Sequence, residues 1–288
     1  MARTELSIDD LSRDFAGFTG SVRARYDRAV VDPVLTELSD LWTDSWVGLR
    51  TTTKPRRESS LRMLCGPGEN PIDRLVDANL LKLDDHRISA LVSDLRSLGP
   101  IEQGVDLEST RGVEKVWLCF REPVSSDDLL GLATLPQSIY DHRVHLAKQT
   151  GRIGAVGVNL TEKSINVYSI VEGEDLGTGD VAEILGQTGI SPPGDDELTV
   201  NTQAFRIYRT FGWDAPDMRR ICFATRFLAE DLPVRLHPDL ASIAAVTPFA
   251  DGNLRDFNFY TSYGPAGHYY KVQAMYRFKE QLFYKSRT

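Results

Sequence analysis

The sequence lacks the features that mark secreted, membrane-spanning and zinc-binding proteins. Its three cysteines, Cys65, Cys119 and Cys222, lie far apart and form neither a CxxC motif nor a cluster with histidine. This spacing gives no indication of a zinc site. The opening residues, MARTELSIDDLSRDF, contain no apolar stretch, and no run of 18 apolar residues occurs. We therefore expect no signal peptide, no membrane span, and a protein of the reducing cytoplasm.

Positive charge is also scarce. The chain has 33 Lys and Arg against 41 Asp and Glu, which gives a formal net charge of −8. That balance argues against nucleic acid or an anionic membrane as a partner, although it leaves room for a small local anion site. A hydrolase has little support either, because there is no GxSxG sequence and none of the five histidines has a serine or cysteine partner by spacing.

What the sequence does contain is a recurring pair of predicted strands. Hydrophobic residues make up 41% of the chain, as expected of a folded globular protein. The strand pairs return about every 50 residues, with amphipathic helices between them. They are predicted over 45–53 and 59–65, 101–108 and 113–121, 152–159 and 163–170, 202–212 and 217–226, and 255–264 and 268–278.

The helices are predicted over 8–44 (two helices broken near Pro33), 70–81, 86–98, 126–131, 136–149, 176–188, 194–199, 236–246 and a short tail after 278. No Pro-, Gly- or Ser-rich linker separates them, so residues 1–288 are predicted to form a single domain. The fold class is α+β. Five ααββ repeats would give a ten-stranded antiparallel β-barrel, surrounded by a ring of helices and wide enough to hold a ligand.

The informative feature is the second face of these strands, because side chains alternate between faces. Over 114–120 the aliphatic residues share one face, while Lys115, Trp117 and Cys119 share the other. The strands around 165–168, 220–224 and 271–275 repeat this pattern with Asn166 and Tyr168, Arg220, Lys271, Gln273 and Met275 on the second face. The amphipathic helices should cover the aliphatic face, which leaves the mixed face inside the barrel.

Several cations enclosed together need an anionic partner, because burying an unpaired charge is costly. A diphosphate would satisfy several of them at once through charge-assisted hydrogen bonds, and nearby aromatic rings would stabilise a carbocation. Two other interpretations stay open at this point. One is a non-catalytic barrel that binds an anionic aromatic ligand, and the other is an interaction protein whose basic strand faces meet solvent.

At these residues the chain resembles the ABBA-type aromatic prenyltransferases of bacterial secondary metabolism, whose barrel is called the PT barrel. The resemblance is carried by LRTTTKPRRESSLRML (49–64), RGVEKVWLCF (111–120), IGAVGVNLTEKSINVYS (153–169), FRIYRTFGWDAPDMRRICFATR (205–226) and YYKVQAMY (269–276). It implies a dimethylallyl (or geranyl) transferase that alkylates an aromatic small molecule by a Friedel–Crafts reaction.

The resemblance also implies which residues hold the substrates. Lys115, Arg220 and Lys271 are the expected catalytic residues. The diphosphate would be bound by Arg50, Arg62, Lys115, Asn166, Tyr168, Tyr208, Arg220 and Lys271. The acceptor would be bound by Leu49, Trp117, Arg206, Gln273 and Met275. Arg206 in that region favours an anionic acceptor, and Gln273 would hydrogen-bond an acceptor hydroxyl or NH.

The residue at position 62 predicts whether the enzyme needs a metal ion. Some relatives have an aspartate there that binds magnesium, whereas this chain has Arg62, as the metal-independent members do. A protein cation can take over the neutralisation of a departing diphosphate. We expect no cofactor and no metal, a monomer, and only small-molecule partners. The acceptor, the donor chain length, the regiochemistry and the choice of C-, O- or N-attachment are left open by the sequence.

Overall fold

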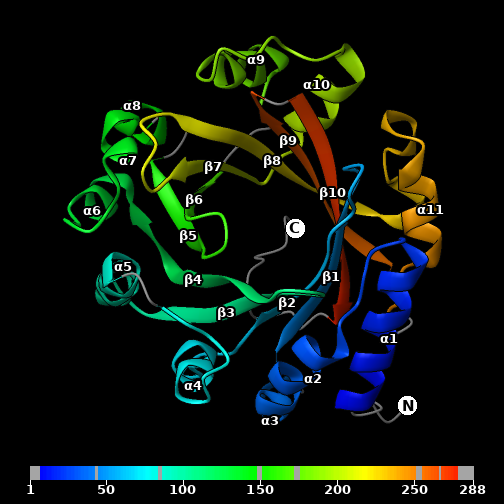
Figure 1. Ribbon diagram of the computed structural model, residues 1–288. Helices are drawn as coiled ribbons and strands as arrows, with labels where there is room; N and C mark the ends of the chain where they lie inside the picture. The colour runs from blue at the N-terminus through cyan, green and yellow to red at the C-terminus, as the bar shows by residue number, and fades with distance from the viewer. Residues whose placement is uncertain are drawn as a thin grey trace.

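In a computed structural model the strands close into a barrel (Figure 1). The structure describes residues 7–42, 45–83, 86–147, 151–171, 176–250, 255–265 and 267–277. Ten antiparallel strands follow one another in chain order, and β1 pairs with both β2 and β10 to complete the ring. They are β1 (Trp46–Thr52), β2 (Ser59–Leu64), β3 (Ile101–Glu108), β4 (Gly112–Ser125), β5 (Arg152–Asn159), β6 (Ser164–Ile170), β7 (Arg206–Gly212), β8 (Met218–Leu228), β9 (Asp256–Gly264) and β10 (Gly267–Arg277). Closure leaves no strand edge unpaired and encloses the inner face of every strand.

The helices lie outside this ring (Figure 1). They are α1 (Ile8–Ser21), α2 (Arg28–Glu37), α3 (Ser39–Trp42), α4 (Pro71–Asp77), α5 (His86–Ser97), α6 (Ser126–Leu130), α7 (Gln137–Asp141), α8 (Arg143–Ala147), α9 (Thr178–Gly186), α10 (Asp195–Thr202) and α11 (Asp239–Val246), with short 3₁₀ turns at Ala229–Asp231 and Val234–Leu236. Capping side chains fix several helix starts: Ser7, Asp27, Asn70 and Ser125 each accept a hydrogen bond from a backbone N–H of the first turn. None of the helices in the described ranges is long and apolar enough to cross a membrane.

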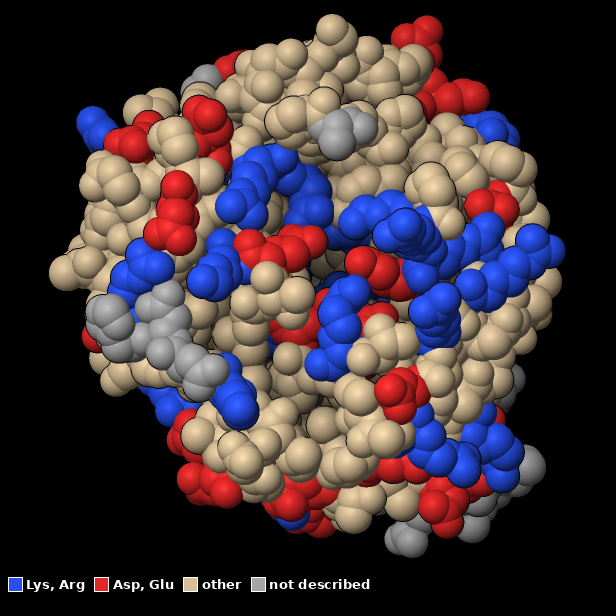
Figure 2. Space-filling view, in the orientation of Figure 1, with Lys and Arg blue, Asp and Glu red and all other residues tan. Residues whose placement is uncertain are grey.

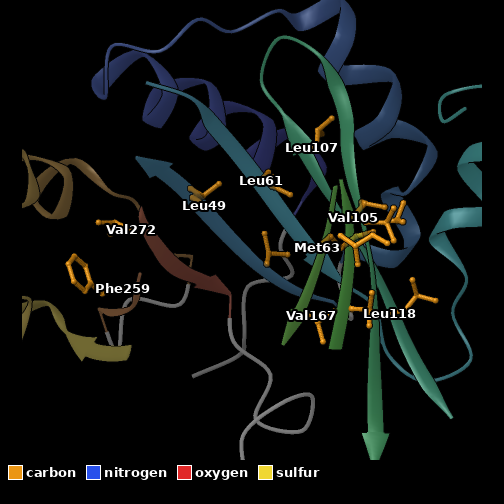
Figure 3. Packing of buried hydrophobic residues seen from close by; sticks show 14 of the residues in the cluster. Leu49, Leu61, Met63, Val105, Leu107, Leu118, Val167, Phe259 and Val272 are labelled. Carbon is orange, nitrogen blue, oxygen red and sulfur yellow. The ribbon is translucent and has the colours of Figure 1, made fainter. Parts of the chain in front are cut away.

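Two separate clusters of buried apolar residues fill the two sides of the barrel wall. The outer cluster contains aliphatic strand residues, such as Leu118 and Val167, together with helix residues, such as Leu11 and Phe15. Figure 3 shows the strand side of this cluster. The interior cluster lies within the barrel and consists of Trp46, Leu64, Trp117, Cys119, Ala155, Tyr168, Tyr208, Cys222, Ala224, Tyr260 and Met275. The prediction that helices cover the aliphatic face and that the mixed face turns inward is therefore confirmed.

The five strand pairs are confirmed, and a few boundaries are corrected. The chain does not break near Pro33, which lies inside α2; it breaks at residues 22–27, where Asp27 caps the next helix. The predicted strand from residue 202 begins only at Arg206, because α10 continues to Thr202. The predicted helical tail after residue 278 lies outside the described residues.

Candidate functional site

One end of the barrel interior holds a cluster of five cations, which we call the cation cluster: Arg50 on β1, Arg62 on β2, Lys115 on β4, Arg220 on β8 and Lys271 on β10. Each comes from a different strand, yet their charges act on one another. Burial lowers the pKa of Lys115, and Arg50, Lys271 and Arg62 lower it further. Figure 2 shows Lys and Arg side chains gathered around a hollow at the centre of the barrel. The predicted cations are thus brought together in one enclosed place.

Asp106 on β3 sits beneath two of these cations and was missed by the sequence reading. It is fully buried, and its carboxylate accepts from Arg62 Nε at 2.7 Å and from Arg62 Nη2 at 3.0 Å. Arg50 Nη1 lies 3.1 Å from Oδ2, the oxygen that accepts from Arg62 Nη2, and Trp117 Nε1 donates to Oδ1 at 2.9 Å. Burial raises the pKa of Asp106, but Arg62 and Arg50 outweigh burial and hold it far below the usual range. Asp106 is therefore a fixed anion that orients two arginines.

A β-bulge supplies a second carboxylate. The register of β3 and β4 shifts between Asp106 and Leu107, so that Asp106 faces Lys115 while Leu107 faces Val113. Glu114 is the extra residue, and a bulged residue leaves the strict alternation of faces. Its carboxylate accepts from Arg50 at 3.3 Å and from Arg111 at 3.0 Å. Strict alternation would have placed Glu114 with the outer aliphatic residues.

Lys115 is the member of the cation cluster whose positive charge most needs an anionic ligand to stabilise it. It is 6% exposed, and no hydrogen bond or ion pair joins its ammonium to another residue within the described ranges. Its contact is with the ring of Trp117, whose centroid lies 5.1 Å from Nζ. Burial, only partly offset by Asp106, lowers the pKa of Lys115 to about 7. An anion bound here would restore the charged form.

Aromatic rings form a wall next to the cation cluster. Tyr208 and Tyr168 lie with their ring centroids 4.6 Å apart, and Tyr168 lies 4.9 Å from Trp117. Lys271 Nζ donates to the hydroxyl of Tyr208 at 2.5 Å. Burial raises the pKa of both tyrosines well above the ordinary value, so both phenols stay neutral. Neutral rings can stabilise a carbocation through their faces while the Tyr208 hydroxyl serves as a hydrogen-bond donor.

Arg220 is oriented by a chain of polar groups. Asn166 accepts from the Thr210 hydroxyl at 2.7 Å, and Arg220 Nε donates to that hydroxyl at 3.4 Å. At the barrel opening Arg220 Nη1 donates to the hydroxyl of Tyr269 at 2.6 Å. The ring of Tyr269 also lies under Lys54, at 4.5 Å, and 5.4 Å from Lys271. Tyr269 was missed, although its spacing of two residues from Lys271 places both on one strand face.

The phenol of Tyr269 predicts a pH effect on anion binding. Burial raises its pKa, but Lys271, Arg220 and Lys54 more than offset burial and lower it to about 8. Above that pH the tyrosinate competes with an anionic ligand for the same cations. The affinity of Tyr269→Phe for inorganic pyrophosphate, relative to wild type, should therefore rise about tenfold one pH unit above 8, as calorimetry would measure. Lys115 titrates equally in both proteins, so its effect cancels in the ratio of their pyrophosphate affinities. An affinity ratio that did not change with pH would contradict this role of Tyr269.

A cavity, partly open to solvent, borders the aromatic wall. It is lined by Trp46, Arg62, Leu64, Trp117, Cys119, Tyr168, Phe205, Arg206, Ala224, Asn258, Tyr260 and Gln273. Three residues predicted for the acceptor, Trp117, Arg206 and Gln273, line it. Both amide atoms of Gln273 are buried without a hydrogen-bond partner among the described residues.

Two predicted acceptor residues lie elsewhere. Leu49 belongs to the outer cluster, where it faces Leu61 and Ala274 across the strand pairs (Figure 3). The inward positions of β1 are Trp46, Gly48 and Arg50, so the prediction for Leu49 is wrong. Met275 belongs to the interior cluster but does not line the cavity.

Gly48 leaves the room that the cavity needs on β1. A Cβ atom at this position would lie 3.0 Å from the Trp46 ring and 3.1 Å from Gln273 Cγ. Any side chain here would push against two residues of the lining. The glycine therefore keeps Trp46 and Gln273 in place at the cavity wall.

Metal ligands are not gathered in this site. The described part of the chain contains no group of three His, Cys, Asp or Glu side chains arranged to hold a metal ion. The two oxygens of Asp106 already accept hydrogen bonds or ion pairs from Arg62, Arg50 and Trp117.

Comparisons with known proteins agree with this geometry. The sequence model of the family described as Aromatic prenyltransferase Orf2 matches residues 6–284. A furaquinocin biosynthesis prenyltransferase of Streptomyces sp. (strain KO-3988) is 25% identical over 266 residues, covering 88% of this chain and 84% of that protein. The 4-hydroxyphenylpyruvate 3-dimethylallyltransferase of Streptomyces niveus is 24% identical over 270 residues, covering 91% and 83%.

The fold has solved counterparts as well. The crystal structure of 5-dimethylallyl tryptophan synthase from Streptomyces coelicolor, in complex with DMASPP and Trp, superposes with a TM-score of 0.62. It covers 99% of this chain and 100% of that one, at 10% sequence identity. The predicted ten-stranded barrel with surrounding helices is thus shared with a structure of known fold.

Proposed function

Since the chain belongs to the family of aromatic prenyltransferases described as Aromatic prenyltransferase Orf2, we propose that it transfers a dimethylallyl group from dimethylallyl diphosphate to an anionic aromatic acceptor, without a metal ion. The observation that carries this proposal is the cation cluster, whose five basic side chains converge beside three carboxylates of the described chain, those of Asp106, Glu114 and Glu162. This excess of basic over acidic side chains fits a ligand that carries more than one negative charge.

The diphosphate would lie among the cations, and its allylic chain would extend along the aromatic wall toward the cavity. As the allylic C–O bond breaks, charge develops on the departing diphosphate, where Lys115, Arg220 and Lys271 are already in place to stabilise it. The allylic cation then lies against the faces of Tyr168, Tyr208 and Trp117. The acceptor in the cavity attacks it, and its ring loses a proton.

Arg206 and Gln273 would orient the acceptor. Arg206 lines the cavity and faces Ala224, a residue of the interior cluster, across the strand pair. A guanidinium at this place favours an acceptor that carries a carboxylate. Gln273, whose amide has no partner of its own in the described structure, would take up a hydrogen bond with an acceptor hydroxyl, carbonyl or NH.

Metal independence gives the first test. Arg62 would supply fixed positive charge at the position where some members of the family have a magnesium-binding aspartate. We expect the rate of transfer from dimethylallyl diphosphate to be the same in EDTA as in excess magnesium, within about twofold. The acceptor panel would contain a naphthol, 4-hydroxyphenylpyruvate and tryptophan, with the prenylated product detected by mass spectrometry. A strict magnesium requirement would defeat the role given to Arg62.

A binding measurement separates this proposal from a non-catalytic barrel. Dimethylallyl thiodiphosphate, which keeps the anion but resists cleavage, should raise the melting temperature strongly. Stabilisation by aromatic compounds alone, with none from the thiodiphosphate, would favour the binding barrel. We also propose a single domain over residues 1–288, a monomer and a cytoplasmic location; the match of the family over residues 6–284 supports the first of these.

A further inference from the structure

A buried carboxylate that the mechanism above does not use lies at the opposite end of β3 from Asp106. Glu102 is 5% exposed. It shares a strand face with Asp106, four residues away, whereas Gln103 between them turns outward to bond Arg96 on α5. Glu102 therefore points into the barrel, about 13 Å along the strand from the Asp106 level.

Glu102 differs from the other buried carboxylates in having no hydrogen-bond or ion-pair partner among the described residues. Asp106 is held by two arginines and a tryptophan, and Glu108 accepts from the backbone N–H groups of Thr110 and Arg111 at 2.8 Å. For Glu102 no hydrogen bond or ion pair joins its oxygens to any residue that the structure describes. A buried carboxylate without a partner is costly, so its presence calls for a ligand.

The neighbours of Glu102 place it beside the acceptor cavity. It lies directly opposite Cys119 in the pairing of β3 with β4, and Cys119 lines the cavity. Burial raises the pKa of Cys119, Arg206 lowers it and Glu102 raises it, so both charges act on this thiol. Among the described residues no ion pair joins Arg206 to Glu102. The acceptor end of the barrel therefore holds two opposite charges that both act on Cys119.

We propose that Glu102 accepts the proton of the acceptor's hydroxyl or N–H group during prenyl transfer, an inference that rests on the proposed function. As the allylic C–O bond breaks and the new C–C bond forms, the acceptor's O–H proton passes to Glu102, which leaves a neutral dienone. The ring C–H proton then leaves to the diphosphate or water, and Glu102 returns its proton to the oxygen. The products are a prenylated phenol and protonated diphosphate, and Glu102 ends as the carboxylate.

The ionisation of Glu102 suits this role. Burial raises its pKa to about 7, and Arg121 on β4 is the charged group that opposes the rise. The thiol of Cys119 on β4 faces Glu102 across the strand pair, and Arg206 on β7 acts on the same thiol. The carboxylate form is present above pH 7, so transfer to a hydroxylated acceptor should rise with pH through that value. A base whose pKa lies near the working pH accepts and returns a proton most efficiently.

The test compares Glu102→Gln with wild type on two acceptors, 2-naphthol and its methyl ether 2-methoxynaphthalene. With 2-naphthol we expect Glu102→Gln to lower kcat/KM about 100-fold and to lose the rise of the rate near pH 7. With the methyl ether, which has no proton to give, both proteins should react at rates within about twofold of each other. Glu122→Gln, which removes an exposed carboxylate on the neighbouring strand, is the matched control and should behave as wild type.

The outcomes separate the two proposals. A wild-type protein that transfers to neither acceptor nor to the panel above would remove the proposed function, and the role of Glu102 with it. An active wild type whose rate and pH profile on 2-naphthol are matched by Glu102→Gln would overturn the role of Glu102 alone. Equal losses on the naphthol and on its methyl ether would show that Glu102 only supports the fold.

Discussion

Replacing Lys271 with methionine should lower kcat/KM for dimethylallyl diphosphate about 1,000-fold while leaving the protein as stable as wild type or more stable. Methionine keeps the length of the side chain and its apolar stem, and removes the charge. Lys271 donates to Tyr208 and lies within reach of the charges of Arg220 and Arg50. The expected loss is that of one preorganised donor to the charge that develops on the leaving group.

The expected stability of Lys271→Met follows from electrostatics in the protein without a ligand. Burial lowers the pKa of Lys271, Tyr269 raises it, and Arg220 lowers it again, so burial and a neighbouring cation both disfavour the ammonium. Removing it relieves repulsion within the cation cluster. A gain in melting temperature together with a loss of turnover is the signature of a site built for a ligand and not for the fold.

Lys82→Met is the control, because Lys82 is an exposed lysine after α4. Binding of the thiodiphosphate by calorimetry would separate affinity from turnover. Should Lys271→Met bind the thiodiphosphate as tightly as wild type and turn over at the wild-type rate, the cation cluster would not be the diphosphate site.

The barrel could be predicted from the sequence because two independent patterns agree. The spacing of the strand pairs predicts how many strands there are, and the alternation along residues 114–120 predicts which strand face turns into the barrel. The interior positions of Lys115, Trp117 and Cys119 followed from alternation alone and are confirmed. Leu49 is the instructive error, because it was assigned by family position although alternation places it on the same face as Val47, in the outer cluster.

What alternation cannot predict is pairing across the barrel and departures from regular strands. Asp106 and Arg62 lie 44 residues apart in the chain and meet only because β2 pairs with β3. Glu114 turns inward because of a bulge that has no clear sequence signal. Glu102 was within reach of the sequence, since the spacing of four residues from Asp106 places the two on one face. The sequence alone gives no reason to single it out, because β3 carries no cation.

Asp106→Asn should destabilise the free protein by about 3–5 kcal/mol, the usual cost of removing one partner from a buried charge network. Asparagine has nearly the same shape, so the packing around Trp117 is kept. The substitution leaves the guanidinium groups of Arg50 and Arg62 buried without their shared anion. The free energy of unfolding from urea titrations would measure the loss. Glu108→Gln is the control, because Glu108 is also buried but accepts its hydrogen bonds from backbone N–H groups and neutral hydroxyls.

Pyrophosphate distinguishes the two variants, because it can replace the lost anion in one of them only. A ligand that binds the folded state stabilises it in proportion to the logarithm of its concentration over Kd. With two arginines released, Asp106→Asn should bind inorganic pyrophosphate more tightly than wild type and recover more stability at the same ligand concentration. At the same pyrophosphate concentration, Glu108→Gln should gain no more stability than wild type does. Equal gains in all three proteins would show that the charge of Asp106 does not reach the diphosphate site.

The stability difference between wild type and Asp106→Asn should change with pH in a definite direction in each of two pH ranges. The arginines hold the pKa of Asp106 far below its ordinary value, and the pKa is near 3.9 in the unfolded chain. A depressed carboxylate stabilises the fold fully above the unfolded value and loses that contribution as pH falls toward the folded one. The gap in stability between wild type and Asp106→Asn should thus narrow below about pH 4. It should also decrease as pH rises through about 7, where Lys115, whose pKa Asp106 raises, loses its charge. A gap that did not narrow below pH 4 would mean that the carboxylate of Asp106 does not neutralise the two arginines.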